Sequence, residues 1–73
     1  MALWCALYIN DRMIGHASAQ RVSGGSEPDD VNTYRAMVST RIGAPWHGEV
    51  THRYGDGGWE LMRKVIEAAE SAR

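Results

Sequence analysis

The last eighteen residues constrain this chain most, because they are typical of a turn followed by a sharply two-sided helix. A break at Asp56, Gly57 and Gly58 precedes a segment with helical periodicity from Trp59 to Arg73. At about 100° per residue, its apolar side chains share one half of the helical wheel: Trp59, Leu61, Met62, Val65, Ile66, Ala68, Ala69 and Ala72. Asp56 is the expected N-cap, with a carboxylate that can accept from the first free amides. Such a helix must cover an apolar surface.

The residues before the helix predict four strands, from alternation of apolar and polar positions and from turn residues between them. The predicted strands are Ala2 to Ile9, Met13 to Val22, Asn32 to Ile42, and Gly48 to Tyr54. We therefore predict an α+β fold with the order ββββα. A four-stranded, mainly antiparallel sheet carries one C-terminal helix on one face, and residues 1–73 form a single domain. The polar loop of residues 23–30 is expected to be mobile.

The register of the first hairpin stays open at this point. Asn10 and Asp11 suit a two-residue turn, because both residue types tolerate a positive φ. Such a turn places Cys5 opposite His16, whereas a three-residue turn shifts the pairing and exchanges the two faces of the strand.

Size and composition limit the classes of function. A chain of 73 residues is marginal as a monomer, and its one cysteine rules out an internal disulfide, so self-association is the most natural source of added stability. The net charge of −1 offers no bulk attraction for nucleic acid. The apolar run at the N-terminus is too short for a signal peptide or a membrane span, which favours a cytoplasmic protein with no membrane partner.

Residues with catalytic or metal-binding chemistry are present but lack a diagnostic arrangement. Cys5 and His16 would form a nucleophile and base in one hairpin register, without an orienting group. His47 and His52 have no metal-ligand spacing. The glycines around Asp56 are not followed by the lysine of a phosphate-binding loop. We therefore expect no enzyme activity, no cofactor and no metal.

One helix covers only one face of such a sheet, so the opposite face is the candidate interaction surface. If Leu3, Cys5, Leu7 and Ile9 face the helix, the core also takes Tyr34, Val38, Ile42, Val50 and Tyr54. The expected contact residues on the open face are Trp4, Tyr8, Arg35, Met37, Arg41 and Arg53, with Trp46 as a further exposed candidate in the turn after the third strand. These residue types predict a homodimer or a host protein as partner. Nucleic acid bound by the same arginines and aromatics is the alternative.

Two stretches carry a resemblance to known sequences. The turn Tyr8-Ile9-Asn10-Asp11-Arg12 and the segment from His52 to Trp59 (HRYGDGGW), which leads into a short helix, resemble small uncharacterised accessory proteins of actinobacteria and their phages. The resemblance concerns the layout of most of the chain. It implies a viral or prophage protein that acts by binding a host component, and it assigns no functional residues.

Overall fold

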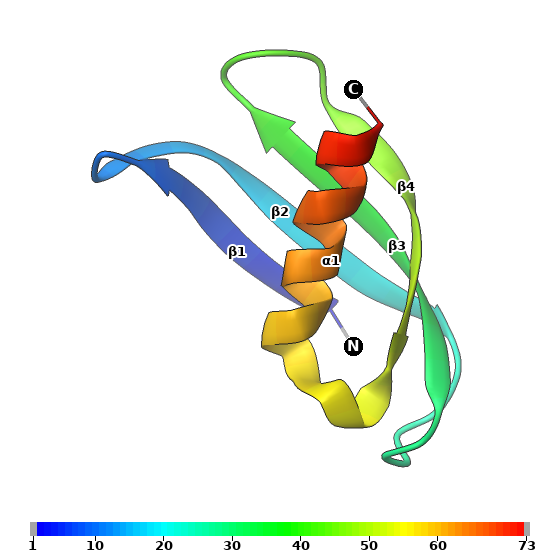
Figure 1. Cartoon of the computed structure of the whole chain (residues 1–73). Helices are drawn as coiled ribbons and strands as arrows, with labels where there is room; N and C mark the ends of the chain where they lie inside the picture. Colours follow the sequence, from blue (N-terminus) through cyan, green and yellow to red (C-terminus); the bar gives the residue numbers. More distant parts are fainter. Residues whose placement is uncertain (1, 73) are drawn as a thin grey trace.

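A computed structural model, which describes residues 2–72, has the predicted ββββα order (Figure 1). Its elements are β1 (Ala2–Ile9), β2 (Arg12–Ser23), β3 (Val31–Thr40), β4 (Trp46–Arg53), the 3₁₀ turn η1 (Tyr54–Asp56) and α1 (Gly57–Ser71). The strands form one antiparallel sheet in the order β1-β2-β3-β4. Each strand therefore pairs with its neighbour in sequence, and β1 and β4 are the two edges.

A bulge in β2 decides the register of the first hairpin. Asn10 and Asp11 have φ values of 50° and 64°, which confirms the two-residue turn. Tyr8 pairs with Met13, but Leu7 pairs with Gly15, so Ile14 is an extra residue in β2. Next to the turn the pairing follows the two-residue register, whereas beyond Ile14 it follows the shifted register that a three-residue turn would give. Cys5 pairs with Ala17.

Small residues in the centre of the sheet let α1 approach closely. Ala17, Ala19 and Ala36 are buried on the face that the helix covers. Above them lie Leu61 and Val65 of α1, both fully buried. The largest fully buried side chain of this core is Tyr34, which the sequence correctly placed there, as it did Val38 and Val50.

Two large side chains near the β3–β4 connection lie where the sequence did not place them. Ile42 was predicted to be in the core but is 68% exposed, because β3 ends at Thr40 and the alternation of the strand no longer applies. Trp46 was predicted to be exposed in a turn but is the first residue of β4 and packs half-buried against the core. Its ring lies over Gly48, whose missing side chain leaves the space.

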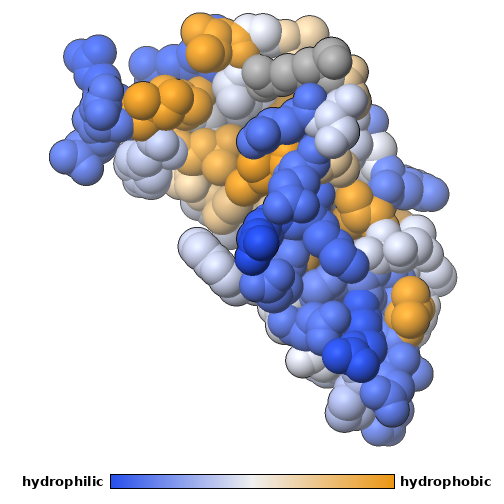
Figure 2. Space-filling view, viewed as in Figure 1, coloured by the Kyte–Doolittle hydropathy of each residue, from blue (hydrophilic) through white to orange (hydrophobic). Residues whose placement is uncertain are grey.

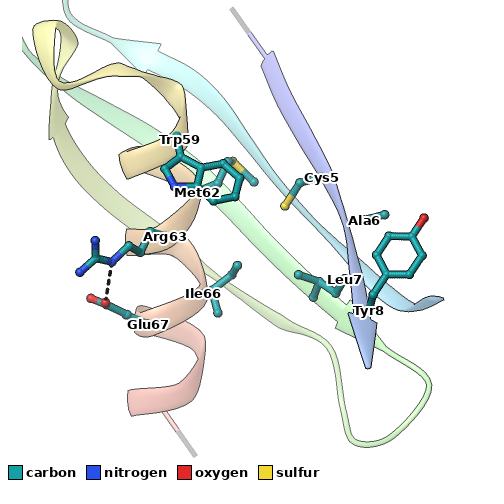
Figure 3. A pocket seen from close by; sticks show the side chains of 9 residues that line it. All are labelled: Cys5, Ala6, Leu7, Tyr8, Trp59, Met62, Arg63, Ile66 and Glu67. Atoms are coloured by element: carbon teal, nitrogen blue, oxygen red, sulfur yellow. Dashed lines mark ion pairs between the residues drawn. The ribbon is translucent and has the colours of Figure 1, made fainter. Parts of the chain in front are cut away.

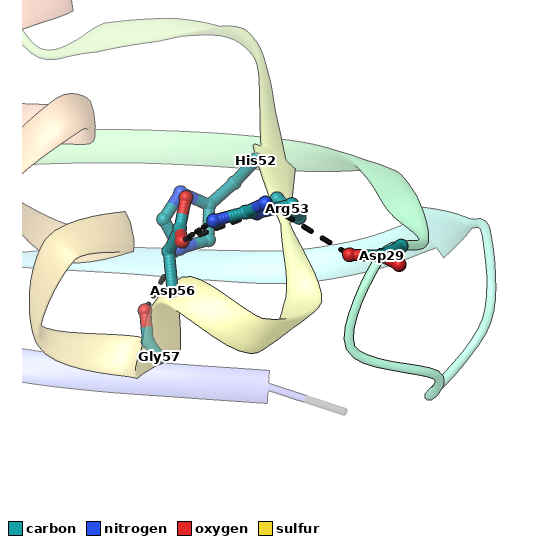
Figure 4. A network of polar contacts seen from close by, with 5 residues as sticks. All are labelled: Asp29, His52, Arg53, Asp56 and Gly57. Carbon is teal, nitrogen blue, oxygen red and sulfur yellow. Dashed lines mark hydrogen bonds and ion pairs between the residues drawn. The ribbon is translucent and has the colours of Figure 1, made fainter.

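The helix starts with a different polar contact from the one expected. Asp56 occupies the N-cap position of α1, but its carboxylate makes no capping hydrogen bond. It accepts instead from Arg53 at 2.7 Å (Figure 4). Leu61, Met62, Val65 and Ala69 form the buried stripe of the helix. Trp59 was predicted to belong to that stripe but is 83% exposed.

The loop between β2 and β3 is tied to the rest of the fold by buried polar groups. The side-chain amide of the fully buried Asn32 donates to the carbonyl of Gly25 and accepts from its backbone N–H, both at 2.9 Å. The backbone N–H of Gly55 donates to the carbonyl of Pro28 at 2.9 Å. The loop predicted to be mobile is therefore anchored at both its start and its middle.

Candidate protein-binding surface

The face opposite α1 carries the two exposed aromatics that the sequence placed there. Trp4 and Tyr8 are 60% and 63% exposed, and neither lies among the residues packed against α1. One row of paired residues runs across the four strands, from Trp4 to Ser18, Met37 and His47. Trp4 and Met37 thus lie two strands apart on one open surface, about 10 Å from each other.

An apolar strip follows β1 on this open face. The indole of Trp4 stacks on the imidazole of His16, with ring centroids 6.0 Å apart. Tyr8 pairs with Met13 of β2, which is also exposed. The aromatic part of the open face is therefore concentrated at the β1 edge of the sheet rather than at its centre.

The three arginines expected on this face do not form one positive cluster. Arg35 pairs across the strands with Glu49. Arg53 lies at the far end of β4 and is held by Asp56, with Asp29 at 3.9 Å (Figure 4). Arg41 lies exposed after the end of β3. Trp46 lies on the helix-covered side of the sheet, so it does not belong to this surface either.

The contact between Arg53 and Asp56 shifts the ionisation of both groups. The hydrogen bond from Arg53, together with its positive charge, lowers the pKa of the Asp56 carboxyl from its ordinary value. The same hydrogen bond and the charge of Asp56 raise the pKa of Arg53. This guanidinium is therefore already engaged at neutral pH, and it serves the junction between β4 and α1.

A groove on the other side of β1 was not found from the sequence. It runs between β1 and α1, has a volume of about 300 Å³, and is mostly apolar. Cys5 and Leu7 of β1 point into it, and Trp59, Met62 and Ile66 line it from the helix (Figure 3). A second hollow of about 570 Å³ shares Leu7 and Ile66 with it and continues toward the β1–β2 turn. Figure 2 shows the resulting apolar surface beside the C-terminal half of α1.

The position of the helix explains this groove. Lys64 of α1 donates to the carbonyl of Thr51 in β4 at 3.1 Å, on the flank of the helix that lies away from β1. The helix packs on all four strands, but it leaves the β1 side of the covered face partly open. The sequence did contain a signal, since both faces of the segment from Ala2 to Ile9 are apolar and one helix cannot cover both.

The structure separates the residues considered for nucleophilic chemistry. Cys5 faces the groove under α1, whereas His16 stacks on Trp4 on the opposite face. This arrangement excludes a Cys5–His16 pair. Within residues 2–72 there is no group of three or more His, Cys, Asp or Glu side chains placed to hold a metal ion. His52 is buried, and its Nε2 lies 2.8 Å from the carbonyl oxygen of Gly57, which ties β4 to the start of α1.

Among the described residues 2–72, no helix is both long enough and apolar enough to cross a membrane. Comparison of the chain with protein-family models, curated proteins and solved structures finds no match. The resemblance to actinobacterial and phage accessory proteins therefore stays a prediction.

Proposed function

We propose that this protein is a small, non-enzymatic binding module that acts through protein–protein contacts on the open face of its sheet. One observation carries the proposal: α1 covers a single face, and Trp4 and Tyr8 stand exposed on the other. Large aromatic side chains are enriched at the centres of protein interfaces, where they bury much area at little conformational cost. The partner is a second copy of the chain or a host protein, in keeping with a phage-type accessory role in the cytoplasm.

The neighbours of these aromatics suit a protein partner. Met37 lies in the same row across the sheet, and a flexible thioether adapts to irregular surfaces. Arg35 of β3 pairs with Glu49 of β4, so charges of both signs lie on the same open face as the apolar strip. An apolar centre with a mixed polar border is the usual composition of a protein interface.

Nucleic acid remains the alternative partner, with less support. Binding to a phosphate backbone requires several cations that act together. Arg35 has an acidic neighbour and Arg53 is held by Asp56, which leaves Arg41 apart from both. A gel shift with single-stranded and double-stranded nucleic acid at low salt measures this alternative directly.

The proposal is tested by a double variant on the exposed aromatics, Trp4→Ser with Tyr8→Ser. Purified wild-type protein and the variant are each used to capture partners, with Val31→Ser as a control that removes an exposed apolar side chain from β3, a strand that does not neighbour β1. We expect the double variant to lose both captured proteins and self-association while its circular dichroism spectrum stays unchanged. Equal binding by the folded double variant and the wild type would sink the proposal.

A further inference from the structure

We infer that the partner of the β1 edge is the β1 strand of a second copy, which pairs with it antiparallel around a two-fold axis at Ala6. This inference rests on the proposed function, because it names the occupant of the same apolar strip and adds the groove behind it. The two four-stranded sheets then join into one sheet of eight strands, and both α1 helices lie on the same side of it.

The two edges of the sheet differ in a way that selects β1. An exposed edge strand is open to pairing with other chains, and proteins protect such edges with charges, prolines or short strands. The eight residues of β1, from Ala2 to Ile9, include no charged residue and no proline. The other edge, β4, carries Glu49 and Arg53. Only β1 is left without this protection, so it is the edge suited to pairing.

A two-fold axis at Ala6 gives the two exposed aromatics of β1 a suitable neighbour. Antiparallel pairing about this point places Trp4 of one copy across from Tyr8 of the other, twice, on the open face. On the helix-covered face it places Cys5 across from Leu7 of the other copy, again twice. Both pairs are apolar, and the small Ala6 lies at the axis, where the two chains meet.

The charged side chains beside the groove are complementary to the same side chains of a second copy. The Nε of Arg63 lies 3.5 Å from a carboxylate oxygen of Glu67, and both residues line the groove (Figure 3). A two-fold axis turns this arrangement around, so that the positive group of one helix faces the negative group of the other. This flank of α1 thus presents no net repulsion to a second copy, whereas it offers little to a polyanion.

The exposed aromatic area is a large part of the area that a stable dimer needs to bury. Trp4, Tyr8 and Trp59 leave most of their surfaces open to solvent, and each aromatic side chain has about 150–250 Å² to bury. Together they supply roughly half of the ~800 Å² that each partner of a stable complex buries. The exposed parts of Leu7, Ile9 and Ile66 around the two hollows add to this area.

The first test introduces a charged side chain at the two-fold axis. We expect wild-type protein to have about twice the 8.1 kDa mass of one chain in light scattering at concentrations near 100 µM. Ala6→Lys and Ala6→Glu each place like charges face to face, so each should weaken the dimer by more than about tenfold. An equimolar mixture of the two variants should recover the dimer. Thr51→Lys, which adds the same charge at the β4 edge, should leave the dimer unchanged.

A second test does not depend on weakening the interface. In a Cys5→Ser background, Ala6→Cys puts two thiols at the axis, within reach of a disulfide. Oxidised glutathione should convert this variant to a covalent dimer, whereas Thr51→Cys in the same background should remain largely monomeric. Equal, slow cross-linking of both variants would overturn the proposed register.

The outcomes separate this inference from the proposed function. A wild-type protein that is monomeric at about 1 mM, or a dimer that persists in both Ala6 variants, would overturn the pairing of two β1 strands. If such a monomer still captures a host protein and loses it with Trp4→Ser and Tyr8→Ser, the binding function stands with another partner. If the folded double variant keeps every partner, the proposed function itself fails.

Discussion

The rings of Trp4 and His16 stack on the uncovered face of the sheet, with an interplanar angle of 25° and centroids 6.0 Å apart. The two residues are not directly paired, because Trp4 pairs with Ser18 and His16 with Ala6. The contact is therefore a diagonal one between neighbouring strands. It keeps the indole against the sheet while leaving most of it exposed.

Loss of this stacking should have a small and measurable cost. We expect His16→Ala to lower the free energy of unfolding by about 0.5–1 kcal/mol, the usual contribution of a cross-strand ring contact. Urea denaturation followed by circular dichroism measures it. His47→Ala, an exposed histidine on the same face, should change stability by less than about 0.5 kcal/mol. Equal effects from the two substitutions would contradict a specific role of the stacked pair.

The core assignment is tested by a pair of aliphatic truncations. Leu61→Ala removes a fully buried side chain of α1. It should lower the free energy of unfolding by about 2–5 kcal/mol, from lost burial and the cavity left behind. Ile42→Ala removes a side chain that the sequence placed in the core but the structure exposes, so its cost should stay within about 0.5 kcal/mol. The midpoints of thermal and urea unfolding report both values. A large cost at Ile42 would show that this residue is buried in solution, for example by a second copy.

The buried amide of Asn32 should contribute strongly to stability, although Asn32 lies beside a loop. Asn32→Ala leaves the carbonyl and N–H of Gly25 without their partner, and we expect a loss of about 1–3 kcal/mol. The nearby Ser26→Ala, at an exposed loop position, serves as the control. Hydrogen exchange of the amides in residues 24–30 should speed up in Asn32→Ala. Unchanged exchange there would mean that the loop is held by other contacts.

The ion pair between Arg53 and Asp56 predicts a specific dependence of stability on pH. Since the pKa of Asp56 is lower in the folded protein than in the unfolded chain, its contribution is complete above the unfolded value of about 3.9 and is lost as the pH falls through the folded value. The difference in urea midpoint between wild type and Asp56→Asn should be constant at neutral pH and shrink below about pH 4.

The same substitution in an Arg53→Ala protein tests whether Arg53 causes this pH dependence. With Arg53→Ala, the hydrogen bond and charge that lower the pKa of Asp56 are gone, so adding Asp56→Asn should leave the pH dependence nearly unchanged. A stability difference between wild type and Asp56→Asn that stays constant down to pH 2 would be inconsistent with this pairing.

Much of the architecture was already determined by local patterns in the sequence. The two-sided helix, the alternation in β3 and the turn at Asn10 and Asp11 each depend on neighbouring residues only, and each was predicted correctly. The open face with Trp4 and Tyr8 follows from the same alternation, because residues two apart in a strand share a face.

The tertiary structure decided the features that the alternation and spacing of residues do not specify. The bulge at Ile14 moves Cys5 away from His16, and no local rule locates such an insertion. Trp46 is half-buried because its own neighbour Gly48 leaves space beside the core, and Asp56 turns to Arg53 because a charged partner is close. The groove beside β1 exists because α1 lies off-centre on the sheet, and where a helix settles is determined by the packing of all the side chains between the two layers.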